Sequence, residues 1–101
     1  MDKKRGVYIP NAFSPNGDGI NDEIMIFANP GVELVEEFLI FDRWGELVFE
    51  NTNFLPNDAN QGWDGKLKGE KMSPAVFTWF AKVRYLDGEK QMFKGDVVLV
   101  R

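Results

Sequence analysis

Residues 76–101, VFTWFAKVRYLDGEKQMFKGDVVLVR, carry the pattern that decides the fold of this chain. Over residues 76–86 apolar side chains alternate with more polar ones, which is typical of a strand with one buried face. The pair Asp87-Gly88 then supplies a tight turn, because these residue types can adopt positive φ angles. Residues 90–101 return as a second strand, so the two segments are predicted to form a β-hairpin. The positions expected on its buried face are Phe77, Trp79, Ala81, Val83, Tyr85, Phe93, Val97 and Leu99.

Upstream of this hairpin, short runs of β-branched and aromatic residues are bounded by turn residues. Their number and spacing predict an all-β domain, an immunoglobulin-like β-sandwich of about seven antiparallel strands. No stretch has a convincing helical period. Residues 1–6 are expected to be a disordered tail and residues 7–101 the folded domain. The upstream strands are expected within residues 7–13, 24–27, 37–41, 46–50 and 66–67.

The composition excludes most enzyme classes. The 101 residues include neither His nor Cys, so the common Ser/His/Asp and Cys/His catalytic sets and the usual zinc ligands cannot be assembled. Adjacent acidic residues on a strand point to opposite faces, so paired carboxylates for glycoside cleavage are not expected either. A net charge of −4 disfavours nucleic acid, and no apolar run reaches the roughly 18 residues of a membrane-spanning helix. The chain is therefore expected to bind or to be recognised rather than to catalyse.

The segment 13–22, FSPNGDGIND, gathers oxygen-bearing side chains around two glycines. It is a candidate calcium site, because calcium takes oxygen ligands. The segment does not match an EF-hand loop, which has Gly at its sixth position and Glu at its twelfth. The alternative is an Asx-rich turn, in which Asn and Asp side chains bond to their own backbone. The calcium ligands would be Asn16, Asp18, Asn21 and Asp22, and no other cofactor is expected.

Two tryptophans lie beside tight turns, and each has two interpretations. Trp63, in GWDG at residues 62–65, is either a sugar-stacking platform next to the Asp64 carboxylate or an aromatic plug in the end of the sandwich. The plug is the favoured interpretation in so small a domain. Trp44, in DRWG at residues 42–45, either joins Arg43 in a surface that anchors a partner or covers the turn.

Together these motifs resemble a known family. FSPNGDGIND at 13–22, DRWG at 42–45, GWDG at 62–65 and KGDVVLVR at 94–101 make the chain similar to the gliding motility-associated C-terminal domain. This is the type B sorting domain of the type IX secretion system in Bacteroidetes-type bacteria. The first two motifs are the specific ones. Ala75 departs from the family, which usually has a glycine just before the aromatic strand.

The resemblance implies an immunoglobulin-like sandwich that acts as a sorting signal for a larger exported protein. The implied partners are the type IX translocon, including a PorP/SprF-type outer-membrane barrel protein, and an N-terminal passenger in the same polypeptide. The passenger would cross the periplasm and reach the cell surface or the medium. The alternative function is an adhesin-type surface module that binds carbohydrate or protein, with calcium as a candidate requirement.

Recognition is expected through the end loops, or through the backbone of the last strand, residues 97–101, if that strand offers an edge for pairing. Arg43 and Trp44 are the favoured contact because their composition is unusual for a turn. The full set of candidate partner-binding residues is Pro15, Asn16, Asp18, Asn21, Asp22, Arg43, Trp44, Trp63 and Asp64.

Overall fold

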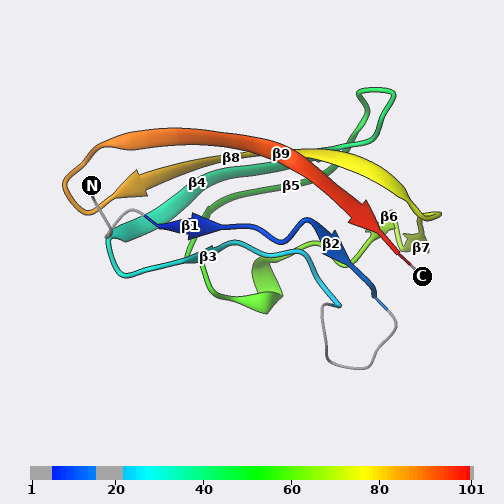
Figure 1. The fold of residues 1–101 in the computed structure, drawn as a ribbon, viewed down its shortest axis with the longest axis horizontal. Helices are drawn as coiled ribbons and strands as arrows, with labels where there is room; N and C mark the ends of the chain where they lie inside the picture. The colour runs from blue at the N-terminus through cyan, green and yellow to red at the C-terminus, as the bar shows by residue number, and fades with distance from the viewer. Residues whose placement is uncertain (1–5, 16–21, 101) are drawn as a thin grey trace.

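The computed structural model describes residues 6–15 and 22–100, which form an all-β sandwich of the immunoglobulin-like class (Figure 1). Its larger layer is a five-stranded sheet in the order β2-β9-β8-β4-β5. No helix in the described residues is long and apolar enough to cross a membrane. The strands of the larger sheet are β2 (Ala12–Phe13), β9 (Lys90–Leu99), β8 (Ala75–Tyr85), β4 (Val32–Phe41) and β5 (Leu47–Phe54).

The hairpin predicted from residues 76–101 lies at the centre of this sheet. Strands β8 and β9 pair in antiparallel register from Ala75 opposite Leu99 to Arg84 opposite Lys90. The Asp87-Gly88 turn is confirmed, since Gly88 N donates to the carbonyl of Tyr85 at 2.9 Å. The predicted alternation is confirmed as well. Phe77, Ala81, Val83, Tyr85, Val97 and Leu99 are buried, whereas Trp79 and Phe93 are half-buried against the core.

The second layer is built from short pieces. Strand β1 (Val7–Tyr8) pairs with β3 (Phe27–Ala28), and a single bridge joins Ile24 to Trp63. The long connection from β5 to β8 contains a 3₁₀ turn (Ala59–Gln61) and a small hairpin of β6 (Lys66–Leu67) and β7 (Glu70–Lys71).

A side chain ties this long connection to the second layer. The Asn57 amide acts as an extra strand residue, because its Nδ2 donates to the carbonyl of Ala28 at 2.9 Å and its Oδ1 accepts from Ala28 N at 3.1 Å. The main-chain N–H of Asn57 also donates to the carbonyl of Ile26 at 2.8 Å. This loop residue therefore satisfies backbone groups that a regular sheet would pair with another strand.

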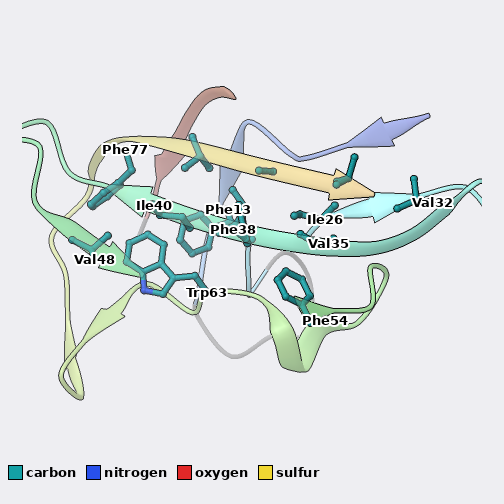
Figure 2. Close-up of a cluster of buried hydrophobic side chains, with 14 of the residues drawn as sticks. Phe13, Ile26, Val32, Val35, Phe38, Ile40, Val48, Phe54, Trp63 and Phe77 are labelled. Atoms are coloured by element: carbon teal, nitrogen blue, oxygen red, sulfur yellow. The ribbon is translucent and has the colours of Figure 1, made fainter. Parts of the chain in front are cut away.

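The core lies between the two layers (Figure 2). It contains residues from both layers, and among the described residues no polar or charged residue is buried in it. The strands of the large sheet supply most of it, and the second layer adds Ile24, Ile26 and Trp63. The connections between the layers are thus held by apolar burial, which contributes roughly 25 cal/mol per Å².

The described residues form nine strands rather than about seven, and β2 runs parallel to β9 rather than antiparallel. The parallel pairing and one of the two extra strands arise in residues 7–13, and the other extra strand is β7, which pairs with the expected strand at 66–67. Pro10 lies between β1 and β2, and proline has no N–H to donate to a ladder. The predicted first strand is therefore divided, and β1 belongs to one layer while β2 joins the other.

Strand β4 begins five residues earlier than expected, at Val32. Its buried residues Val32, Val35 and Phe38 are three apart, which breaks the two-residue period of a regular strand. Irregularities in register between Val32 and Leu34 and between Val35 and Glu37 absorb the extra residues. The inward side chains thus stay on one face although the sequence pattern does not alternate.

The last strand does not offer the edge expected for residues 97–101. Val98 and Leu99 pair with β8 on one side and with β2 on the other. Val98 N donates to the carbonyl of Asn11, and Val100 N donates to that of Phe13, both at 2.9 Å. Backbone pairing at this position is already made within the chain, so recognition there by an added strand is not supported.

Candidate functional site

The turn between β4 and β5, DRWG, projects beyond the sheet at one end of the molecule (Figure 1). Its first residue organises it. The Asp42 Oδ1 atom accepts from the backbone N–H of Trp44 and of Glu46, each at 2.9 Å. The Asp42 carbonyl accepts from Gly45 N at 3.0 Å, and Gly45 has a φ of 83°, a conformation that favours glycine. The side chain of Asp42 therefore fixes the shape of the turn in an Asx pattern.

This rigid turn presents an aromatic residue to solvent. The Trp44 side chain is 81% exposed. The guanidinium carbon of Arg43 lies 5.3 Å from the centroid of the Trp44 ring, which is a cation–π arrangement. Arg43 is exposed as well. Of the two interpretations of Trp44, the surface location holds and the covering of the turn does not.

Trp63 has the opposite environment. It is only 2% exposed and lies against the inner face of the large sheet (Figure 2). Its ring contacts Phe77 at 5.1 Å and Phe13 at 5.6 Å between centroids. Its indole Nε1 donates to the carbonyl of Lys66 at 2.8 Å, so the one polar atom of the side chain has a partner. The prediction of an aromatic plug is confirmed, and the sugar-stacking interpretation of Trp63 is wrong.

The main chain at Gly62 and Trp63 lies close to Ile24, which explains how the Trp63 side chain can enter the core. Trp63 and Ile24 exchange two main-chain hydrogen bonds, of 2.9 and 3.0 Å. A side chain on Gly62 would place its Cβ 2.6 Å from the carbonyl oxygen of Ile24, so only glycine permits this approach. The exposed Asp64 accepts from Lys66 N at 3.1 Å and thus serves the turn.

The described ends of the segment 13–22 lie in the same region of the fold, since Phe13 contacts Trp63 and Asp22 lies two residues before Ile24. Pro15 and Asp22 are half-buried. The predicted residues Asn16, Asp18 and Asn21 lie outside the described residues. Within the described ranges no group of three or more His, Cys, Asp or Glu side chains is placed to hold a metal ion. The calcium site therefore stays a prediction.

The structure brings two of the four sequence motifs together and places a third, DRWG, nearby. FSPNGDGIND and GWDG meet through the ring contact of Phe13 with Trp63. The DRWG turn lies at the same end of the sheet, because Phe41, just before the turn, pairs with Thr78 near the start of β8, and Ala75 pairs with Leu99 beside Phe13. This end of the sandwich thus combines a buried aromatic support with an exposed Arg-Trp pair.

Sequence reasoning missed two features of the sheet. Glu36, a residue of central strand β4, has a side chain that is only 14% exposed and forms ion pairs with Lys82, Arg84 and Lys90. These lysine and arginine residues are 46 to 54 positions away in the chain, so only the strand pairing reveals the cluster. The second feature is an apolar groove on the outer face of the sheet, described below.

Comparison with known families gives a match over most of the chain. The family model described as the CHU_C type IX secretion signal domain matches residues 7–99. This agrees with the resemblance read from the four motifs. A comparison with curated proteins finds no match. A secretion signal domain is not a catalytic family, and nothing in these comparisons supports the surface-binding alternative.

Proposed function

The chain belongs to the family of CHU_C type IX secretion signal domains, and from that premise we propose how its signal is read. It is a sorting signal that engages the type IX secretion machinery and directs a protein across the outer membrane, to the cell surface or beyond. We propose that the machinery contacts the β4–β5 turn through Arg43 and Trp44. The component proposed to make this contact is a PorP/SprF-type outer-membrane barrel protein.

The exposure of Trp44 is the observation that carries the proposal. An 81% exposed tryptophan leaves a large apolar surface in water, and tryptophan and arginine are the residue types most enriched at the energetic centres of protein interfaces. Asp42 holds the turn in one conformation through two hydrogen bonds. A partner therefore does not have to order this loop on binding, which lowers the entropic cost of recognition.

The proposal extends to the rest of the polypeptide. The exported passenger would be N-terminal to residue 7, and it would enter the domain through β1, which lies in the second layer. The turn of β4 and β5 projects at the other end of the long axis in Figure 1. A passenger attached through β1 would thus leave the Arg-Trp turn open to the translocon.

The test is an export assay in a bacterium with a working type IX system. Residues 7–101 are fused to the C-terminus of a periplasm-targeted fluorescent protein, and fluorescence is measured in the medium, on the surface and in the periplasm. The unaltered fusion should be exported only when the translocon is present. The double variant Arg43→Ala/Trp44→Ala should reduce export by roughly tenfold or more, since a loss of about 1.4 kcal/mol in binding already gives tenfold.

The matched control is Leu86→Ala, which truncates a 67% exposed side chain in the β8–β9 turn at the opposite end of the sheet. It should export as the unaltered fusion does. Full export of the double variant would remove the proposed contact but would leave the sorting function intact. Retention of the unaltered fusion in cells with an active translocon would show that the domain is not a sufficient signal.

A further inference from the structure

The outer face of the large sheet, turned away from β1 and β3 in Figure 1, carries side chains in cross-strand rows. Paired residues in a sheet point to the same side, so the register gives the rows directly. Read from β5 to β9, the first is Thr52, Glu37, Lys82 and Met92; the second is Glu50, Leu39, Phe80 and Lys94; the third is Leu47, Phe41, Thr78 and Asp96.

The middle of this face is apolar and hollowed. A groove of about 190 Å³ lies over the centre of the rows. Phe41 and Phe80 meet edge to face inside it, with ring centroids 5.6 Å apart. Met92 is 61% exposed, and Leu47 is 41% exposed. An open face of an antiparallel sheet is usually polar, and a contiguous apolar patch indicates an interaction surface. The groove is lined by Glu37, Leu39, Phe41, Phe80, Ala81, Lys82 and Met92.

In the first two rows charges of opposite sign flank this apolar centre, whereas the third row has acidic Asp96 on β9. In the second row an acidic residue, Glu50, stands on β5 and a basic residue, Lys94, stands on β9. In the first row Glu37 stands on β4 and Lys82 on β8. Glu50 and Lys94 are exposed, and within the described part of the chain neither makes an ion pair.

We propose that this face binds the same face of a second copy of the chain. The two copies would be related by a two-fold axis that lies in the interface, parallel to the strands and midway between β4 and β8. This axis places each row of one copy opposite the same row of the other, with β5 facing β9 and β4 facing β8. Glu50 of one copy then faces Lys94 of the other, and Leu39 faces Phe80. Glu37 likewise faces Lys82, which also contacts Glu36 within its own chain at 3.9 Å. Thus each acidic residue of these two rows meets a basic residue, and the apolar centres meet each other.

The size of the face suits such a pair. The four long strands are about 4.8 Å apart and rise about 3.3 Å per residue, so ten-residue strands cover roughly 600 Å² in projection. Because side chains project from the sheet, the accessible area is larger than this projection and approaches the ~800 Å² per partner of a standard interface. Two sheets stacked in this way would also adopt the aligned packing that twisted sheets prefer.

The test measures the mass of the chain in solution. Light scattering and sedimentation over roughly 1 to 500 µM should show a reversible change from one to two copies. Glu50→Lys alone, or Lys94→Glu alone, should weaken the dimer by roughly tenfold or more, because each puts two like-charged pairs into the interface. Both residues are exposed and lie at opposite ends of one row, so neither change should affect folding.

Restoring complementarity gives the decisive result. The double variant Glu50→Lys/Lys94→Glu should dimerise as the unaltered chain does. An equimolar mixture of the two single variants should form a mixed dimer, since both of its charge pairs are again attractive. A chain that stays monomeric at 500 µM overturns the proposal, and so does a dimer insensitive to these exchanges.

The same variants distinguish a different occupant. A monomeric chain whose export falls with Lys94→Glu would mean that this face contacts the secretion machinery rather than a second copy, which also overturns the proposal. The mass is measured on the chain alone, with no translocon in the sample. Failure of this test therefore leaves the role of Arg43 and Trp44 in export untouched, and loss of that role would leave the dimer untouched.

Discussion

The segments DRWG at 42–45 and GWDG at 62–65 contain the same three residue types, Asp, Trp and Gly, yet their tryptophans have opposite environments. Trp44 is 81% exposed and Trp63 is 2% exposed. Trp44 lies in a hairpin turn that projects beyond the large sheet (Figure 1), whereas Trp63 lies against the inner face of that sheet (Figure 2). Burial is thus decided by what lies opposite a turn and not by the composition of the turn.

The two turns also use their aspartates in parallel ways. Asp42 Oδ1 accepts backbone N–H groups two and four residues ahead, and Asp64 Oδ1 accepts one two residues ahead. Each aspartate shapes its turn locally. Only the GWDG segment also gains stability from burial, because its Trp63 packs against Phe13 and Phe77. One segment therefore stabilises the fold, while the other presents a surface.

The largest effect should follow from Trp63→Ala. Removing a buried aromatic side chain costs about 3–5 kcal/mol, which is a large part of the stability of a small domain. The free energy of unfolding, measured by urea denaturation, should fall by this amount. A loss below about 1 kcal/mol would contradict the role of Trp63 as a core residue, because an exposed aromatic gives a loss of that size or less.

A smaller effect should follow from Asp42→Ala. The change removes the acceptor of two hydrogen bonds in an exposed turn and should lower the free energy of unfolding by about 1 kcal/mol. Asp42→Asn is the matched control, since its side-chain oxygen can still accept both bonds. If Asp42→Ala and Asp42→Asn gave equal losses of stability, the hydrogen bonds would not be what shapes the turn.

The smallest effect on stability should follow from Trp44→Ala. Because this side chain has little packing to lose, the free energy of unfolding should change by no more than about 0.5 kcal/mol. Export should nevertheless fall in the fusion assay. Trp44→Phe, which keeps an aromatic face, should retain more export than Trp44→Ala. A destabilisation above about 1 kcal/mol would show that Trp44 supports the fold, and the contrast with Trp63 would fail.

Much of the central sheet could be predicted because its signals are local. Alternation over residues 76–86 and the Asp87-Gly88 turn correctly predicted the β8–β9 hairpin. The prediction missed the start of β4, because the bulges change the period from two to three between Val32 and Phe38. It also joined β1 to β2 across Pro10. Irregular strands carry no simple period, so their pairing is visible only when the partner strands are in place.

The candidate site divides in the same way. The composition of DRWG predicted a contact surface at Arg43 and Trp44, and both residues are exposed in the structure. The same reasoning favoured a plug over a platform for Trp63, and its packing against Phe13 and Phe77 confirms the plug. The roles of Asn16, Asp18 and Asn21 stay a prediction.

The amino-acid sequence by itself determined the strand-rich character of this protein, its central hairpin and its membership of a secretion signal family, because alternation, turn chemistry and short motifs are properties of neighbouring residues. The tertiary structure alone decided which tryptophan is buried, that the last strand is paired on both sides, and that Glu50 and Lys94 stand at opposite ends of one row. These features depend on the register between strands whose paired residues are up to 86 positions apart in the chain, as for Ala12 and Val98. A contact of that kind arises from the packing of whole layers, and no local pattern encodes it.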